Sequence, residues 1–165
     1  MVNKEKLFQE IFQANSKKIY HLCYGYTGDS DTANDLMQET FLKVWQNLDK
    51  FRNQAMISTW IYRIAVNTCL SHLRVEKRQA KDELTENIIE SKAEEFSEKN
   101  EQIALLYRCI SKLEENERII ITLVLDEVPY PEIAEISGIS EGNLRVKIHR
   151  IKHKLTELYN RYERI

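Results

Sequence analysis

A stripe of aromatic, basic and amide side chains runs along one side of an otherwise apolar segment at residues 56–76. On a helix that turns by about 100° per residue, four such residues lie within about 60° of one another: Trp60, Arg63, Asn67 and Arg74. They suit unpaired nucleic-acid bases, because a ring stacks on a base, an amide reads its edge and guanidinium groups hold phosphates. The alternative is that Trp60 belongs to the core and the arginines pair with acids of neighbouring helices. Two residues of the preceding loop share this chemistry: Phe51 and Arg52.

A second candidate surface lies on the segment 30–48, which has a wide apolar face and an opposite polar face. Asp35, Gln38 and Glu39 gather on the polar face. Leu42 lies among them, within about 20° of Asp35. A single exposed leucine is common on a solvated face, but a leucine framed by acids and amides is also typical of a docking surface for a partner protein. The pattern leaves both interpretations open.

The segments 129–137 and 141–162 have the spacing of a helix-turn-helix. Gly138 stands at the turn, where a positive φ is needed, and Ser140 is placed to cap the second helix. The stretch from residue 143 to residue 155 contains no acid, so the second helix is either a solvated basic helix or a DNA reader. In a major groove, arginine can pair with guanine, asparagine with adenine, and valine can touch a thymine methyl. The candidate DNA-binding residues are Ser140, Asn143, Arg145, Val146, Lys147, His149 and Arg150.

The elements that must position these residues are all helical. The 165 residues include only 4 glycines and 2 prolines, and their apolar residues recur with the helical period, so the fold class is all-α. We expect two small helical domains, 1–76 and 101–165, joined by a linker at 77–100 that is acidic and poor in apolar residues. The expected helices are 4–26, 30–48, 56–76, 98–112, 114–127, 129–137 and 141–162.

Charge is distributed unevenly along the chain. The 24 basic and 26 acidic side chains give a net charge of −2, which by itself argues against a nucleic-acid binder. That total combines +2 in residues 1–75, −4 in residues 76–105 and 0 in residues 106–165. The near-neutral net charge is the sum of a basic helix and an acidic linker, so it does not exclude DNA binding.

The remaining composition limits the compartment and the chemistry. The 3 cysteines are odd in number and far apart, and the N-terminus lacks an apolar signal core, which indicates a reducing cytoplasm. The isolated Cys69 and His72 have no second ligand pair at zinc spacing, so no metal site and no cofactor are expected. A phosphate-binding glycine loop and a nucleophile motif are also missing, so we do not expect an enzyme.

Three stretches in order resemble the bacterial RNA polymerase sigma factors of the extracytoplasmic-function (ECF) type. Residues 35–45, DLMQETFLKVW, are similar to the family's polymerase-binding segment. Residues 59–67, TWIYRIAVN, are similar to its promoter-melting and minus-ten-reading helix. Residues 133–150 are similar to its minus-thirty-five-reading helix-turn-helix, and the resemblance covers nearly the whole chain.

The resemblance implies a transcription initiation factor that binds core RNA polymerase and promoter DNA. Residues 1–76 would be sigma region 2, and the face with Asp35, Gln38, Glu39 and Leu42 would dock on the clamp helices of the largest polymerase subunit. The stripe on 56–76 and its preceding loop would capture the minus-ten element. Residues 101–165 would be sigma region 4, reading the minus-thirty-five element and contacting the polymerase flap, while the linker follows the RNA exit path. The resemblance also implies an anti-sigma partner, which could tether the chain to a membrane without insertion.

The match has departures, and other functions remain as alternatives. The family often has threonine where Asn143 stands and serine where Val146 stands, which leaves the promoter sequence open. A repressor that acts without polymerase would use the helix-turn-helix and a dimer interface, but it gives no reason for the other two surfaces. An adaptor that mimics a sigma factor and only binds regulators is the second alternative.

Overall fold

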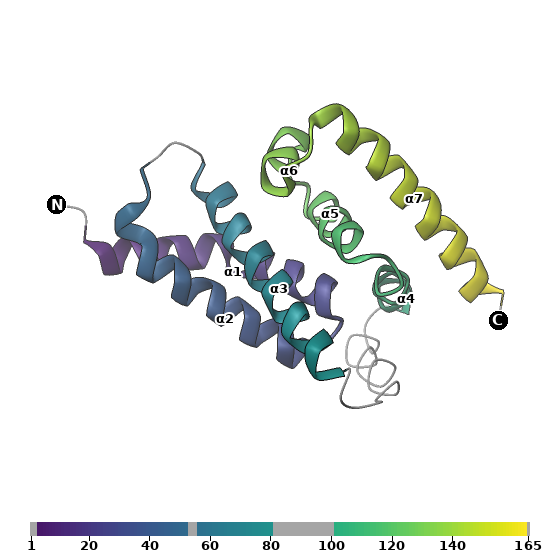
Figure 1. Cartoon of the computed structure of the whole chain (residues 1–165), viewed down its shortest axis with the longest axis horizontal. Coiled ribbons are helices and arrows are strands. Elements are labelled where there is room, and N and C mark those ends of the chain that lie inside the picture. Colours follow the sequence, from purple (N-terminus) through teal and green to yellow (C-terminus); the bar gives the residue numbers. More distant parts are fainter. Residues whose placement is uncertain (1–2, 53–55, 81–100, 165) are drawn as a thin grey trace.

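The elements follow the apolar periods and caps of the sequence. The computed structural model describes residues 3–52, 56–80 and 101–164, with the backbone alone at 77–80. Within these residues it has no strand, so the all-α prediction is confirmed. The helices, labelled in Figure 1, are α1 (Lys4–Thr27), α2 (Ser30–Asn47), a 3₁₀ turn (Leu48–Lys50), α3 (Ile57–Ala80), α4 (Glu101–Ile110), α5 (Glu115–Leu125), α6 (Tyr130–Ser137) and α7 (Glu141–Glu163).

The helix boundaries differ from the prediction by a few residues, for local reasons. α3 continues to Ala80 because no glycine or proline stops it at residue 76. α5 ends at Leu125 because Glu127 has a φ of 60°, which a right-handed helix does not allow. The first residues of the predicted helix 98–112 and most of the predicted linker 77–100 lie outside the described residues.

Helices α1, α2 and α3 pack side by side, each reversing the direction of the one before (Figure 1). Gly28 ends α1 with a φ of 70°, and Asp29 then caps α2 by accepting a hydrogen bond from the Asp31 backbone N–H. The buried core of this bundle combines aliphatic side chains with buried tyrosines, and a separate aromatic cluster joins α1 to α2. In that cluster Phe41 meets the ring of Phe12 edge-on, with 4.9 Å between ring centroids.

Helices α6 and α7 form the predicted helix-turn-helix, α5 packs against both of them, and α4 packs against α7. At the turn, Gly138 has a φ of 72°, and the N–H groups of Gly138 and Ile139 both donate to the Ala134 carbonyl. Ile133 and Leu144 are fully buried between α6 and α7, which sets the angle at which the second helix leaves the turn.

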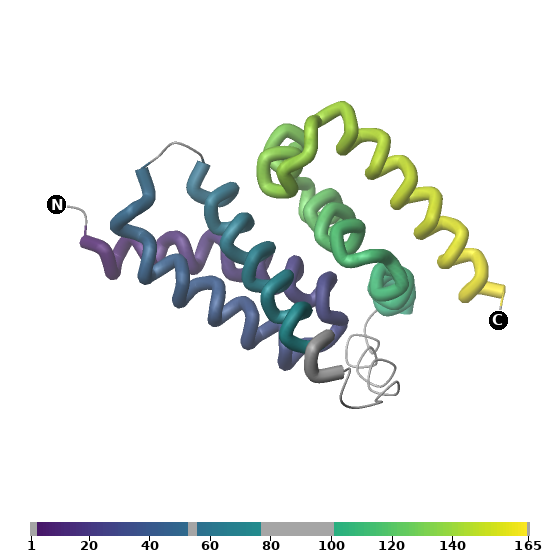
Figure 2. The backbone as a smooth tube through the Cα atoms, in the orientation of Figure 1, coloured from purple at the N-terminus to yellow at the C-terminus, as the bar shows by residue number. Residues whose placement is uncertain are grey.

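The two helical groups pack against each other, so that one buried cluster of side chains runs through both. α1 contacts α5 and α3 contacts α6, although these pairs are far apart in the sequence (Figure 2). Across the part of the chain that is described, no helix combines the length and the apolar character needed to cross a membrane.

Candidate nucleic-acid and partner interfaces

The polar face of α2 is open to solvent. Asp35, Gln38 and Glu39 are all exposed, and Leu42 between them is 56% exposed. Glu39 forms an ion pair of 3.3 Å with Lys43, one turn later. An apolar side chain therefore stands at the centre of a polar surface, as the sequence pattern predicts, and it is free to be covered by a partner.

The stripe of Trp60, Arg63, Asn67 and Arg74 on α3 is only partly exposed to solvent and free of contacts with other helices. Trp60 is half-buried against the core, and its ring lies 5.0 Å from that of Phe51. Arg63 pairs with Glu135 of α6, with one nitrogen 3.3 Å from both the Glu135 carboxylate and its backbone carbonyl. Trp60 and Arg63 therefore have the packing and pairing roles of the alternative interpretation, and each also keeps an exposed portion. The other candidates of this set are exposed: Arg52, Asn67 and Arg74.

The candidate DNA-binding residues of the helix-turn-helix lie at the start of α7 and along its outer face. Ser140 caps the helix, because its hydroxyl accepts a hydrogen bond of 3.3 Å from the Asn143 N–H. Arg145 has two contacts within the chain, because it lies 3.1 Å from the Glu141 carboxylate and its guanidinium lies 5.3 Å from the Tyr130 ring centroid. Lys147 is half-buried, and the remaining candidates are exposed: Asn143, Val146, His149 and Arg150.

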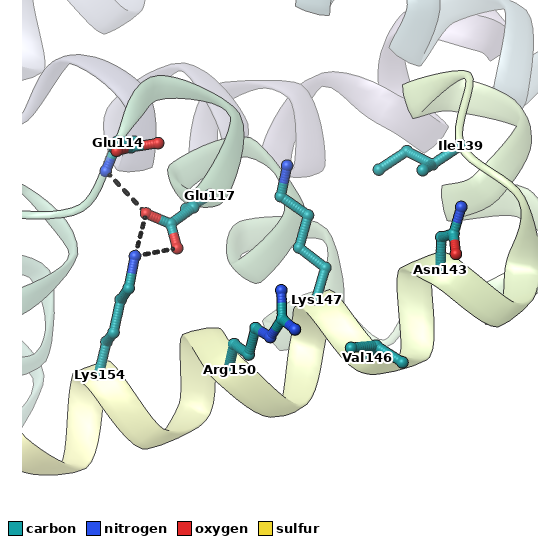
Figure 3. Close-up of a pocket in the computed structure, with 8 residues that line it drawn as sticks. All are labelled: Glu114, Glu117, Ile139, Asn143, Val146, Lys147, Arg150 and Lys154. Atoms are coloured by element: carbon teal, nitrogen blue, oxygen red, sulfur yellow. Dashed lines mark hydrogen bonds and ion pairs between the residues drawn. The ribbon is translucent and has the colours of Figure 1, made fainter.

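A pocket of about 440 Å³ opens beside this face of α7 (Figure 3). It is lined by Glu114, Glu117, Ile139, Asn143, Val146, Lys147, Arg150 and Lys154. Four of the predicted DNA-binding residues therefore share one concave surface, together with a basic side chain that the prediction did not include.

A buried carboxylate at the edge of this pocket, Glu117, was not among the predicted residues. Glu117 is 5% exposed and accepts two hydrogen bonds from the Lys154 ammonium, at 2.9 and 3.1 Å, and one from the Glu114 N–H (Figure 3). The hydrogen bond to Glu117 raises the pKa of Lys154. The only sequence signal for this arrangement is the capping box formed by Glu114 and Glu117.

A second group that sequence reasoning missed lies between α1 and the end of α5. The His21 Nδ1 lies 3.2 Å from the Asp126 Oδ1, and these residues are 105 positions apart. Burial raises the pKa of Asp126, while the hydrogen bond to His21 acts in the opposite direction. No local pattern could reveal such a pair, because it exists only where the two helical groups meet.

Comparisons with known proteins connect these surfaces to a family. The family model of Sigma-70 region 2 matches residues 11–79, which contain the candidate residues of α2 and α3. The family model of Sigma-70 region 4 matches residues 103–155, which contain α6, the turn and all the candidate DNA-binding residues of α7.

Whole proteins of this family align with the chain over most of its length. The chain is 31% identical over 161 residues to the ECF RNA polymerase sigma factor SigW of Bacillus subtilis, covering 90% of this chain and 86% of SigW. It is 28% identical over 155 residues to SigM of the same organism, covering 92% of this chain and 94% of SigM. It is also 31% identical over 169 residues to the ECF sigma-E factor of Escherichia coli, covering 92% of this chain and 85% of that protein.

Among solved structures, the fold resembles the sigma factor RpoE in its complex with the anti-sigma factor NepR from Bartonella quintana. The TM-score is 0.75 at 19% identity, with 94% of this chain and 98% of that chain covered. Because both sigma regions occur in order and full-length relatives match, the chain belongs to the ECF RNA polymerase sigma factors, the initiation factors that direct polymerase to promoters.

Proposed function

We propose that this chain binds core RNA polymerase through α2, reads the minus-ten element with α3 and its preceding loop, and reads the minus-thirty-five element with α7. One observation carries this proposal: each candidate set lies on a separate helix with exposed members, inside the sigma region that the family resemblance assigns to that role. The three sets are consecutive along the chain, so a single polypeptide can contact polymerase and both promoter elements.

The polymerase contact is proposed for the face of α2 with Asp35, Gln38, Glu39 and Leu42. The exposed Leu42 supplies apolar area at the centre, and the surrounding polar groups supply hydrogen bonds at the rim, which is the usual anatomy of a protein interface. The proposed partner of this face is the pair of clamp helices of the largest subunit, as the resemblance implies. The polymerase flap is the partner proposed for region 4.

The minus-ten contact is proposed for Trp60, Asn67 and the basic groups around them. Trp60 and Phe51 form an aromatic platform on which an unpaired base of the non-template strand can stack. Asn67 is exposed on the same stripe and can read the edge of that base. Capture of unpaired bases lowers the free energy of the opened duplex relative to the closed one. Phosphates would be held by Arg52, Arg63 and Arg74.

The minus-thirty-five contact is proposed for the first turns of α7, which would enter the major groove. Arg145 is suited to a guanine, Asn143 to an adenine and Val146 to a thymine methyl. Lys147, His149 and Arg150 follow along the helix and would contact phosphates, and Ser140 lies at the helix N-terminus, where a phosphate is favourable.

An anti-sigma factor is a further proposed partner. The structural neighbours with the same fold are a sigma factor bound to NepR and CnrH bound to the cytosolic domain of CnrY, the latter with a TM-score of 0.69 at 18% identity. The bound NepR and CnrY are partners of those two sigma factors. They support an anti-sigma partner for this chain because the similarity in fold extends over both of its helical groups.

Run-off transcription with purified core polymerase tests the central claim. The full chain should give promoter-specific transcripts, and a chain that binds DNA but does not bind core polymerase would instead be a repressor. A chain that binds core but starts no transcript on any promoter would be an adaptor.

Two variants separate the DNA contacts. Asn67→Ala should reduce permanganate reactivity of the open complex and leave binding to a minus-thirty-five duplex unchanged, with the exposed Asn160→Ala as its matched control. Arg145→Ala should weaken binding to that duplex by about 1–3 kcal/mol if it reads a base. Arg161→Ala, at the far end of the same helix, should have no effect on this binding.

A further inference from the structure

We propose that Glu117 limits the DNA contacts of α7, because it holds Lys154 away from the DNA backbone and so ends the row of phosphate contacts along that helix. This inference rests on the proposed function, which assigns α7 to the minus-thirty-five element. Since phosphate contacts carry no sequence information, the restraint lowers the affinity of α7 for every duplex and leaves its sequence preference unchanged.

Lys154 stands at a position where a phosphate contact is expected. Four polar residues share one side of α7, because they follow one another at intervals of four, three and four positions: Asn143, Lys147, Arg150 and Lys154. Lys154 lies one helical turn beyond Arg150, about 6 Å farther along the helix axis. It is exposed and belongs to the stretch 143–155, which contains no acid. By its type and position alone, Lys154 would extend the proposed phosphate contacts by one.

In the structure, however, Lys154 is paired with Glu117 of α5 (Figure 3). Its ammonium donates hydrogen bonds of 3.1 and 2.9 Å to the two carboxylate oxygens, which uses two of its three hydrogens. The hydrogen bond to Glu117 raises the pKa of Lys154, so the ammonium stays protonated within the pair. The positive charge of Lys154 is therefore balanced by a carboxylate of the chain itself.

Burial of the Glu117 carboxylate makes this pair costly to break. Glu117 is buried, and its Oε1 also accepts a hydrogen bond of 3.2 Å from the Glu114 N–H at the start of α5. Withdrawal of Lys154 toward a phosphate would leave a buried carboxylate without its cation, which is strongly destabilising. The gain would be an ion pair between an exposed lysine and a phosphate, which contributes little at a solvated surface. The pair therefore persists when α7 lies on DNA.

The remaining ammonium hydrogen of Lys154 does not restore a full phosphate contact. A phosphate that accepted it would also approach the side chains of Glu117 and Glu114, which both line the pocket beside α7 (Figure 3). Repulsion between these carboxylates and the phosphate opposes the attraction of the ammonium. Glu114 and Glu117 thus form an acidic edge at the point where the basic side of α7 reaches Lys154.

The salt dependence of DNA binding counts phosphate contacts and therefore tests this inference. The full chain is assembled with core polymerase and titrated with a labelled duplex that carries the minus-thirty-five element of a promoter the holoenzyme transcribes. The same duplex with that element scrambled measures binding without sequence preference. Each phosphate contact adds about −0.9 to the slope of the logarithm of the association constant against the logarithm of the salt concentration.

Glu117→Gln should steepen this slope by about 0.9, because Lys154 keeps its charge and loses the carboxylate that balances it. Affinity should rise roughly 3- to 8-fold at 0.1 M salt, equally on both duplexes. Ethylation interference should show one additional phosphate that the variant holoenzyme requires. Glutamine also suits this position of a capping box, so the start of α5 should be retained and the melting temperature should change little.

Two further variants show whether the gain comes from Lys154. Glu117→Gln combined with Lys154→Gln has no charge at the site, as the wild-type pair has none, and should return to the wild-type slope and affinity. Glu163→Gln removes one negative charge from an exposed position at the end of α7 and should leave the slope unchanged.

Three results would overturn the inference. The first is an unchanged slope in Glu117→Gln. The second is a double variant as steep as Glu117→Gln, because the gain would then not come from Lys154. The third is a double variant with a slope shallower than wild type by about 0.9, which would mean that Lys154 already contacts a phosphate in the wild-type chain.

Failure of the proposed function is distinguishable from these results. A holoenzyme that shows no preference for the intact element, and whose affinity Arg145→Ala does not change, would overturn the assignment of α7 to that element and this inference with it. A holoenzyme that keeps its preference while Glu117→Gln leaves the slope unchanged would overturn the role of Glu117 alone.

Discussion

Truncation of Leu42 to alanine should weaken binding to core polymerase about 5-fold without changing the stability of the chain. Complete burial of a leucine side chain is worth about 1.5–3 kcal/mol. Because Leu42 is 56% exposed in the free chain, roughly half of this gain is still to be made on docking. Alanine retains one methyl group, so the loss on truncation is about 1 kcal/mol, which is about a 5-fold increase in Kd. The fold should not respond, because the atoms removed contribute little to the core.

The assay is fluorescence anisotropy of the labelled full chain titrated with core polymerase, run beside a titration with minus-thirty-five duplex. Val146→Ala is the matched control, because Val146 is an aliphatic residue of similar exposure, 52%, on the proposed DNA face of α7. Leu42→Ala should weaken the binding of polymerase alone, and Val146→Ala the binding of duplex alone.

Three results would contradict the docking role of Leu42. One is unchanged polymerase binding by Leu42→Ala, another is equal loss of polymerase binding by both variants, and the third is a lower melting temperature for Leu42→Ala. The combined variant Leu42→Asp with Glu39→Lys should abolish polymerase binding while the circular dichroism spectrum stays helical, because both positions are exposed.

Three further predictions concern the core. Phe41→Ala should lower the free energy of unfolding by about 3–5 kcal/mol in urea titrations, since a 3% exposed ring is lost; a loss under about 1 kcal/mol would contradict this packing. Burial raises the pKa of Tyr62, so the contribution of Tyr62 to stability should be constant below pH of about 10 and fall above it, as the unfolded phenol ionises first. Tyr62→Phe should reduce that alkaline loss in melting curves and cost little at neutral pH, because the hydroxyl has no hydrogen-bond partner within the described part of the chain. Cys23, Cys69 and Cys109 are buried. The hydrogen bond shared between the Cys23 and Cys69 thiols, together with burial, raises the pKa of Cys23, and burial raises the pKa of Cys109. A disulfide reagent at pH 8 should therefore modify them slowly in the native chain and rapidly in guanidinium; fast native reaction would be inconsistent with this core.

Local patterns were sufficient to predict the helices and the surfaces they carry. The helical period places Leu42 among Asp35, Gln38 and Glu39, because residues three and four apart share a face whatever the helix packs against. The turn at Gly138 and the cap at Ser140 are equally local, since each depends on the backbone within a few residues. The short motifs that predicted the sigma family are likewise contained within single helices or one helix-turn-helix.

Only the tertiary structure decided which of these faces meet each other. The stripe on α3 is predictable, but the pairing of Arg63 with Glu135, 72 residues away, depends on how α6 lies across α3. A Cβ atom added to Gly25 would collide with Thr122 in another helical group, and nothing near Gly25 in the sequence marks this contact. The pair of the buried Glu117 with the exposed Lys154 joins α5 to α7 in the same way. Helical periodicity specifies which side of a helix is apolar, whereas the partner of each side follows from the packing of several helices at once. Local sequence patterns therefore identify the family and the helix faces it could use, whereas the packing of α6 against α3 leaves one of those faces partly covered.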